Sequence, residues 1–220
     1  MKYKAILFDL DGTLLDSVNV ILKTAKKVFG TMGIIYDETD LRKSIGVPLK
    51  VQAMRYCGDR AGEFTDLYRK EYSKNSGEDG RVFPYTLEML NALRTQGYTT
   101  ALVTSKSTST AKWAVEHTGM TGKFDVIVTA DDVEHPKPHP QPILKALEIL
   151  KVKPQESIYV GDSLFDVDAA QKANVTMVGV SWGARSKEDM QSMCVEHIID
   201  SWNEFLVWLN GSSTNVHLLK

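Results

Sequence analysis

The sequence predicts an α/β protein with a doubly wound parallel sheet and a helical insertion after the first strand. Short apolar runs that end in polar residues recur along the chain, and from residue 84 onward they alternate with helical stretches of about three turns. Strand followed by helix, repeated, is typical of a parallel sheet covered by helices on both faces. Between residues 17 and 80 the alternation breaks, because helical patterns follow one another there without a strand.

The expected strands share one pattern, an apolar run that stops at a polar loop. The first covers residues 5–8 and stops at Asp9, the start of the polar stretch 9–13. Because the carboxyl ends of parallel strands meet at one edge of a sheet, where such sheets bind ligands, these loops mark the candidate site. The other strands are expected at residues 98–103, 126–128, 157–160, 177–180 and 198–199.

Helices are expected between the strands, from the spacing of apolar residues and from residues that favour helix ends. Gly97 stands just past one expected C-terminus, and Ser201 is placed to cap the last helix at its N-terminus. These helices are expected at residues 86–96, 109–118, 142–151, 164–173 and 202–209.

The insertion is expected to form a helical domain, with helices at residues 18–29, 38–45, 49–56 and 61–75. Asp16 and Ser17 lead into it, and the glycine-rich acidic stretch 77–80 leads out, so both linkers have the composition of hinges. The expected division is an α/β core, residues 1–16 and 81–220, and a helical domain, residues 17–80.

Composition places the chain among ordinary globular proteins. Hydrophobic residues make up 43% and charged residues 25%, so a chain of 220 residues has enough apolar side chains for a buried core. The net charge of −2 gives no basic field for nucleic acid or for an anionic membrane. We therefore expect a small solute as the partner, and neither nucleic acid nor a membrane.

The cysteines and the N-terminus indicate a cytoplasmic location. Cys57 and Cys194 are the only cysteines, and their separation fits neither a disulfide framework nor a zinc site. The first apolar run stops at Asp9, and no stretch approaches the roughly 18 apolar residues of a membrane span. We expect an untargeted cytoplasmic protein that is a monomer or a weak homodimer.

Two carboxylates, Asp9 and Asp11, stand two residues apart after the first strand. They repel each other unless a divalent cation binds between them, and Mg²⁺ favours a shell of hard oxygen ligands that includes carboxylates. An aspartate carboxylate is also a known nucleophile in phosphoryl transfer. The alternative is an ordinary strand-end turn, where Asp and Gly are common. An EF-hand is excluded by the early position of Gly12, and Walker A and GxGxxG patterns are absent from the sequence.

Asp162 and Asp166 repeat this arrangement after the expected strand 157–160. They are about one helical turn apart and therefore share a face of the following helix. By itself, Asp162 fits the N-cap of that helix better than a functional site. A functional site is favoured because carboxylates or hydroxyls occur at three strand ends on one edge of the same sheet.

Thr104, Ser105 and Lys137 add hydroxyls and a cation to this edge. Thr104 and Ser105 follow the second strand, where hydroxyl and backbone N–H groups are placed to bind a phosphate oxygen, although both residues also suit a helix cap. Lys137 lies in the stretch 135–140, whose prolines hold it in a stiff extended segment; most lysines are simply surface residues. The histidines of that stretch are expected to flank a turn and not to bind metal.

These stretches resemble the four ordered motifs of the haloacid dehalogenase-like (HAD) hydrolase superfamily. The resemblance implies a Rossmann-like core, and the helical insertion resembles the C1-type cap that closes over the site and selects the substrate. Within the superfamily, residues 44–49 and 128–140 are similar to phosphoglycolate phosphatases and the related pyrophosphatase PpaX. The matching motif residues are Asp9-Leu10-Asp11-Gly12-Thr13, Thr104, Lys137 and Gly161-Asp162 followed after three residues by Asp166.

The resemblance implies a role for each matching residue. Asp9 would be the nucleophile and a magnesium ligand, and Asp11 would be the general acid and base and would give the metal its backbone carbonyl. Thr104, with Ser105 beside it, would bind the transferring phosphoryl group. Lys137 would neutralise charge on the nucleophile and the phosphate. The magnesium site would be completed by Asp162, with Asp166 supporting it or holding Lys137.

The implied function is a Mg²⁺-dependent phosphatase that hydrolyses a small phosphate ester, phosphoglycolate or a relative of it, through an aspartyl-phosphate. A pyrophosphatase and a β-phosphoglucomutase-like phosphomutase stay open as alternatives. From a different class, a catalytically idle module that binds small phosphates also stays open. A haloacid dehalogenase is disfavoured, because its chemistry needs neither the second aspartate nor magnesium.

Overall fold

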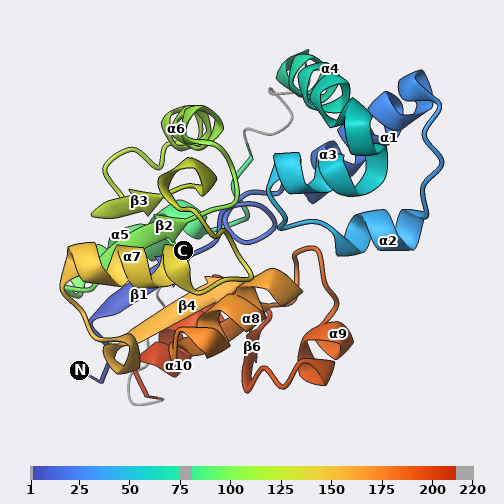
Figure 1. Ribbon diagram of the computed structural model, residues 1–220. Coiled ribbons are helices and arrows are strands. Elements are labelled where there is room, and N and C mark those ends of the chain that lie inside the picture. Colours follow the sequence, from blue (N-terminus) through green and yellow to red (C-terminus); the bar gives the residue numbers. More distant parts are fainter. Residues whose placement is uncertain (1, 75–80, 212–220) are drawn as a thin grey trace.

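The computed structural model describes residues 2–74 and 81–211 and confirms the predicted α/β fold (Figure 1). Six parallel strands form one sheet in the order β3-β2-β1-β4-β5-β6. Each strand lies where an apolar run predicted it, with ends that differ by at most one residue from the expected ones. The strands are β1 (Ala5–Phe8), β2 (Thr99–Val103), β3 (Val126–Val128), β4 (Ser157–Gly161), β5 (Thr176–Val180) and β6 (His197–Ile199).

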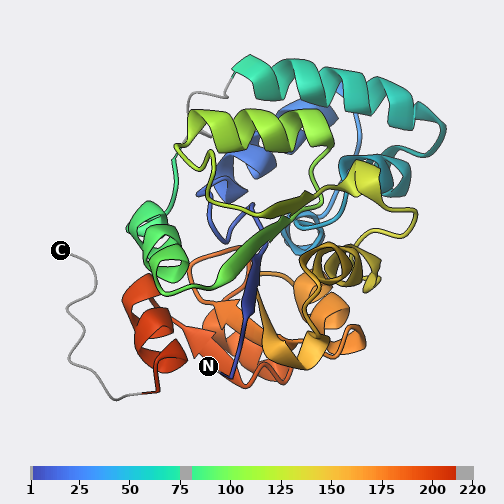
Figure 2. The ribbon, with the colours of Figure 1, turned by 90° about the vertical axis from the view of Figure 1, so that its left-hand side faces the viewer.

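Helices cover both faces of the sheet (Figure 2). On one face lie α5 (Thr86–Thr95) and α10 (Trp202–Leu209), and on the other lie α7 (Gln141–Leu150) and α8 (Leu164–Lys172). After β2 the chain forms α6 (Thr108–His117). These five helices correspond to the five expected ones.

One short helix, α9 (Lys187–Ser192), was not predicted from the sequence. Only Met190 of its six residues is buried, so it has no apolar stripe that repeats over several turns. Its N-terminus is instead fixed by a capping box, in which the Ser186 hydroxyl accepts from the Asp189 N–H and the Asp189 carboxylate accepts from the Ser186 N–H.

The central strand β1 explains why the chain begins with a continuous apolar run. All four of its residues are fully buried, because helices cover both faces of the sheet at this point. Ile6 and Phe8 pack into the cluster under α5 and α10, and Ala5 and Leu7 pack into the cluster under α7 and α8. The pairing of Phe8 with its neighbours on β2 and β4 puts the residues that follow these three strands at one edge of the sheet.

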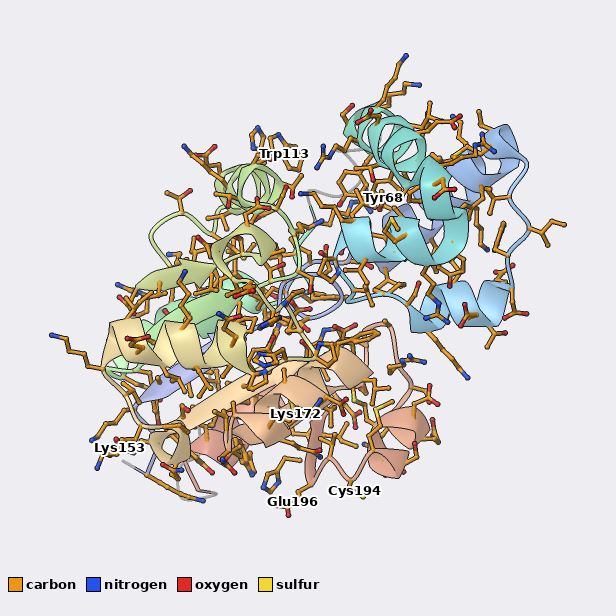
Figure 3. All side chains as sticks on the ribbon, in the orientation of Figure 1. Tyr68, Trp113, Lys153, Lys172, Cys194 and Glu196 are labelled. Atoms are coloured by element: carbon orange, nitrogen blue, oxygen red, sulfur yellow. The ribbon has the colours of Figure 1, made fainter. Side chains whose placement is uncertain are left out.

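The insertion consists of α1 (Val18–Met32), α2 (Glu38–Lys43), α3 (Leu49–Cys57) and α4 (Ala61–Lys74), and we call residues 18–74 the helical segment. It has its own apolar cluster, in which Phe29 stacks on Phe64 with ring centroids 4.9 Å apart. Tyr68 packs on Phe64 inside the segment (Figure 3). The expected exit linker at residues 77–80 lies outside the described residues.

The first helix of the segment is longer than the sequence predicted. It runs three residues past the expected end at Phe29 and stops at Met32, where Gly33 takes a left-handed conformation with φ of 67°. Within the described residues, no helix has the length and apolar character needed to cross a membrane.

Candidate active site

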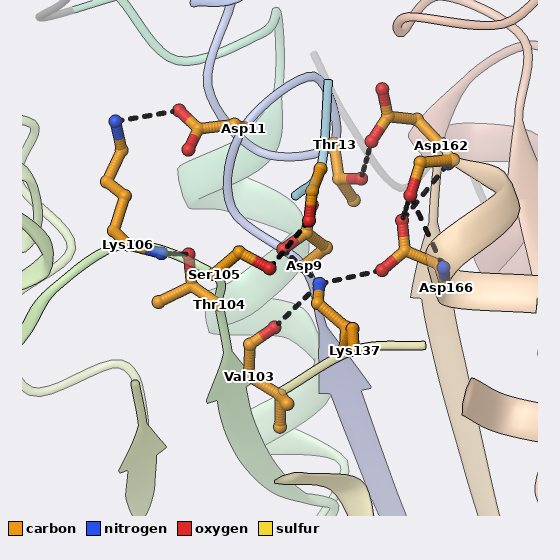
Figure 4. A network of polar contacts seen from close by, with 12 residues as sticks. Asp9, Asp11, Thr13, Val103, Thr104, Ser105, Lys106, Lys137, Asp162 and Asp166 are labelled. Carbon is orange, nitrogen blue, oxygen red and sulfur yellow. Dashed lines mark hydrogen bonds and ion pairs between the residues drawn. The ribbon is translucent and has the colours of Figure 1, made fainter. Parts of the chain in front are cut away.

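Side chains from the ends of β1, β2 and β4 meet at one edge of the sheet, as Figure 4 shows. Asp9 directly follows β1, Thr104 follows β2 and Asp162 follows β4. The Asp9 N–H donates to the Val160 carbonyl at 2.9 Å and the Thr104 N–H donates to the Val128 carbonyl at 2.9 Å. The sheet hydrogen-bonding pattern therefore continues into the site and fixes where these side chains begin.

A buried ammonium group, that of Lys137, lies at the centre of this edge. Its Nζ is 2.7 Å from Asp9 Oδ1, 2.7 Å from Asp166 Oδ1 and 2.9 Å from Tyr159 Oη. Burial lowers the pKa of Lys137, but the Asp166 and Asp9 carboxylates outweigh it and hold the pKa well above its usual value. Lys137 therefore carries its charge at neutral pH.

Two carboxyl groups at this edge, those of Asp9 and Asp162, hold protons more tightly than exposed ones do. Burial raises the pKa of Asp9 to about 7, in spite of the Lys137 ammonium, which lowers it. Burial also raises the pKa of Asp162 well above its usual value, and the charges of Asp166 and Asp9 add to this effect. A site of this kind gains stability from a bound cation, because the cation favours the ionised form of both carboxyl groups.

Backbone packing fixes the carboxylate of Asp162. Its Oδ1 accepts from the Thr13 hydroxyl at 3.1 Å and its Oδ2 accepts from the Ala184 N–H at 2.6 Å. A Cβ on Gly12 would lie 2.1 Å from Asp162 Oδ2, and one on Gly183 would lie 2.3 Å from Asp162 Cβ. The loops after β1 and β5 thus enclose this carboxylate at distances that only glycine permits.

Asp162 is not the N-cap of α8, which was the alternative for it. Ser163 is the N-cap, and Asp166 is its partner in a capping box. Asp166 Oδ2 accepts from both the N–H and the hydroxyl of Ser163, while Oδ1 accepts from Lys137 and Tyr159. Two donors already bind each oxygen of Asp166, which is close to the capacity of a carboxylate.

Three buried carboxylates fit a divalent cation. Asp9, Asp162 and Asp166 each offer an oxygen, and these oxygens lie within 4.8 Å of one another. When all are ionised, the three carboxylates and the Lys137 ammonium carry a formal charge of about −2, which matches one divalent cation. The donors are hard oxygens, the type that Mg²⁺ prefers.

Asp11 lies apart from these carboxylates. Its Oδ1 is 3.0 Å from Lys106 Nζ and accepts from the Ser17 hydroxyl at 2.6 Å. The side chain is partly exposed, whereas Asp9 is only 2% exposed. The structure therefore brings Asp9, Lys137, Asp162 and Asp166 together and puts Asp11 next to the helical segment.

Thr104 and Ser105 lie beside the cluster and have different surroundings. The Thr104 hydroxyl accepts from the Lys106 N–H at 3.2 Å, which leaves its own proton for another acceptor. The Ser105 hydroxyl donates to the Gly46 carbonyl of the helical segment at 2.6 Å. In this arrangement Ser105 joins the core to the segment.

The helical segment covers the same edge of the sheet. Besides the Ser105 bond, Arg185 donates to the Lys43 carbonyl at 2.9 Å and Lys106 donates to the Tyr72 hydroxyl at 2.9 Å. A cavity of about 280 Å³ lies between segment and core. Its apolar lining residues include Val47, Pro48, Pro136 and Phe165. Its polar lining residues are Ser44, Gln52, Arg55 and Lys137.

Sequence reasoning did not identify Tyr159, Lys106 or the loop at Gly183 and Ala184. Tyr159 lies within an apolar run and looks like an ordinary core residue. Lys106 directly follows Thr104 and Ser105, and this position next to two predicted site residues was the signal that could have identified it. The loop after β5 has the same pattern of strand and polar break as the other site loops, so applying that rule to residues 181–184 would have found it.

Comparisons with known proteins agree with this geometry. Residues 6–180 match the family model described as haloacid dehalogenase-like hydrolase. The chain is 31% identical over 210 residues to the pyrophosphatase PpaX of Bacillus mycoides, a match that covers 94% of this chain and 96% of that protein.

Solved structures with the same fold include a protein of Lactobacillus plantarum described as a phosphoglycolate phosphatase. It has a TM-score of 0.83 and 25% identity, and the match covers 94% of this chain and 99% of that one. A protein of Clostridium acetobutylicum described as a phosphatase has a TM-score of 0.82 and 29% identity, with coverage of 96% and 99%. The chain belongs to the haloacid dehalogenase-like hydrolase family.

Proposed function

We propose that this protein is a Mg²⁺-dependent phosphatase that hydrolyses a small phosphate ester through an aspartyl-phosphate on Asp9. The observation that carries the proposal is the buried ion pair between Lys137 Nζ and Asp9 Oδ1, 2.7 Å apart, inside a group of carboxylates that fits a divalent cation. The buried Lys137 ammonium fixes the orientation of the Asp9 carboxylate. Its positive charge also neutralises the negative charge that develops during the reaction.

In the first step, an Asp9 carboxylate oxygen attacks phosphorus and the bond from phosphorus to the leaving oxygen breaks. Asp11 gives its proton to the leaving oxygen. In the second step, a water oxygen attacks the phosphorus of the aspartyl-phosphate, Asp11 takes the proton, and Asp9 is regenerated with release of phosphate. Lys137 stabilises the negative charge near Asp9 in both steps, and Thr104 donates its hydroxyl proton to a phosphoryl oxygen.

Asp9, Asp162 and the Asp11 backbone carbonyl are the proposed magnesium ligands. Asp166 borders the same group, and with four donors already on its oxygens we assign it to holding Lys137 and Ser163. When bound, Mg²⁺ supplies positive charge that neutralises the phosphoryl oxygens.

The helical segment is proposed to act as a cap that covers the site during turnover. Its contacts with Ser105, Lys106 and Arg185 all lie beside the carboxylate cluster, which supports a role in excluding bulk water. The cavity of about 280 Å³ between segment and core supports a small leaving group.

A second candidate is hydrolysis of inorganic pyrophosphate. The similarity to PpaX of Bacillus mycoides over nearly the whole of both chains favours it. Both reactions use the same attack by Asp9 and differ only in whether the leaving oxygen belongs to an alcohol or to a second phosphate.

The test is phosphate release from para-nitrophenyl phosphate, phosphoglycolate and pyrophosphate in the presence of Mg²⁺. The proposal expects release that disappears in Asp9→Asn. Asp131→Asn is the matched control, because Asp131 also follows a strand end but binds the Thr108 N–H, away from Lys137. The relative kcat/KM values decide between ester and pyrophosphate. Release that persists in Asp9→Asn would refute the covalent mechanism.

A further inference from the structure

We infer that Tyr159 is a positioning residue for Lys137, whose hydroxyl holds the ammonium group against Asp9. This inference rests on the proposed function, because it assigns a task to a residue that the proposed reaction does not itself use. Tyr159 lies in the middle of β4 and is fully buried. Its ring packs on the face of the sheet covered by α7 and α8, and its hydroxyl contacts Lys137 and Asp166.

The hydrogen bonds around Lys137 show why a hydroxyl is needed there. An ammonium has three protons to donate and no lone pair. Within reach of Nζ are Asp9 Oδ1 and Asp166 Oδ1, each at 2.7 Å, Tyr159 Oη at 2.9 Å and the Val103 carbonyl at 3.3 Å. Two protons go to the carboxylates, so the third has Tyr159 as its shorter acceptor.

Tyr159 differs from the other three acceptors because it also donates. Its own proton reaches either the Val103 carbonyl at 3.2 Å or Asp166 Oδ1 at 2.9 Å. When Lys137 donates to Tyr159, every Lys137 proton has an acceptor, and the Tyr159 proton has Asp166 Oδ1 as its shorter acceptor. A phenylalanine ring offers neither the acceptor nor the donor.

The tyrosine ring is packed against the sheet inside an apolar cluster. Leu7 of β1 is the register partner of Tyr159 on β4, and both side chains belong to the apolar cluster on that face. A lysine side chain has several rotatable bonds and loses much rotamer freedom when it is fixed. Strand β4 therefore fixes the Tyr159 hydroxyl, and the hydrogen bond from Lys137 to this hydroxyl keeps the ammonium group beside Asp9.

The alternative is that Tyr159 is an ordinary buried tyrosine whose hydroxyl merely takes the nearest partners. Both readings expect Tyr159→Phe to lower stability, so stability alone does not separate them. The two explanations differ in whether the loss caused by Tyr159→Phe depends on Lys137. A positioning role requires that the loss depend on the presence of the lysine ammonium.

The kinetic test compares Tyr159→Phe with the control Tyr3→Phe, which removes a buried tyrosine hydroxyl that contacts Thr176 and lies away from Lys137. We expect Tyr159→Phe to lower kcat roughly 10- to 100-fold, the range for one hydrogen bond to a charged group, with KM changed less than about threefold. Tyr3→Phe should keep kcat within about twofold. An unchanged kcat in Tyr159→Phe would overturn the inference.

A double-mutant cycle in urea unfolding tests the same contact without turnover. The metal-free wild-type protein is compared with Tyr159→Phe, Lys137→Met and the double variant. We expect Tyr159→Phe to lower the urea midpoint clearly in the wild-type background and much less in the Lys137→Met background. Equal shifts in both backgrounds would overturn the inference. If wild-type protein shows no Asp9-dependent phosphate release, the proposed function fails, and this cycle still decides whether Tyr159 acts on Lys137.

Discussion

Lys106 Nζ lies 3.0 Å from Asp11 Oδ1, and this ion pair connects the proposed acid–base residue to the helical segment. The same ammonium donates to the Tyr72 hydroxyl of α4 at 2.9 Å. Ser17, at the entrance to the segment, donates to the Asp11 oxygen that Lys106 contacts. Asp9 differs, because its cationic partner Lys137 is fixed within the core. We therefore expect movement of the segment to change the position of Asp11 more than that of Asp9.

Asp11→Asn should lower turnover by roughly 10²- to 10⁴-fold, the usual share of general acid–base catalysis, while Mg²⁺ binding persists. Asparagine keeps the size and the backbone carbonyl of Asp11 but has no proton to transfer. With a good leaving group the first step needs little protonation, so phosphorylated Asp9 should accumulate and be detectable by mass spectrometry. Near-normal turnover with both good and poor leaving groups would show that another residue moves the proton.

Gly46→Ala should hold the helical segment away from the core. Gly46 has φ of 97°, and a Cβ there would lie 2.8 Å from Ser163 Oγ and 3.2 Å from the Phe165 ring. We expect a fall in kcat/KM of at least about tenfold and a larger radius of gyration in small-angle scattering.

The matched control for this variant is Gly30→Ala. Gly30 lies in α1, and a Cβ there would meet nothing within 4 Å, so the substitution should leave kcat/KM unchanged and stabilise the helix slightly. If Gly46→Ala shows the larger radius of gyration but keeps wild-type kinetics, closure of the segment over the site does not matter for turnover.

The central strands were predictable because residues buried on both faces of a sheet form a continuous apolar run in the sequence. A parallel strand such as β1 must be apolar throughout, and the chain becomes polar where it leaves the sheet at Asp9. The short helix α9 leaves no comparable mark, since its single buried residue, Met190, gives no periodicity.

The edge that holds the candidate site was predictable, but several of its contacts were not. Strand ends that carry Asp9, Thr104 and Asp162 must converge in a parallel sheet. The Ala184 N–H that donates to Asp162 is a backbone group, so it cannot be recognised from the type of side chain at that position. Tyr159 has the same sequence signature as a core residue, because its ring is in the core and only its hydroxyl reaches the site.

Removal of Mg²⁺ should abolish turnover. Asp9, Asp162 and Asp166 lie close together, and Lys137 pairs with two of them, so an anionic phosphate ester meets uncompensated negative charge without the cation. Dialysis against EDTA, with metal content checked by elemental analysis, should give no phosphate release, and added Mg²⁺ should restore it. Full turnover in protein shown to be free of metal would contradict the proposed cofactor.

Mg²⁺ binding should be coupled to release of protons and should strengthen as pH rises to about 7. Burial raises the pKa of Asp9 in the metal-free protein from 3.8 to about 7, so below that pH a proton occupies the carboxyl group that Mg²⁺ needs. Because the folded protein holds this proton more tightly than the unfolded chain, the metal-free protein should lose stability as pH rises from about 4 to about 7.

The stabilisation that Mg²⁺ provides should therefore be small at about pH 5 and large at about pH 8, where Asp9 is ionised and the cation offsets its charge. Urea unfolding with and without Mg²⁺ at both pH values measures this difference, and titration calorimetry in buffers of different ionisation enthalpy measures the released protons. Asp162→Asn should weaken the effect of Mg²⁺ at about pH 8, and Asp131→Asn, which alters a carboxylate outside the cluster, should keep it. An equal Mg²⁺-induced shift at both pH values, with no proton release, would mean that the cation does not bind at Asp9.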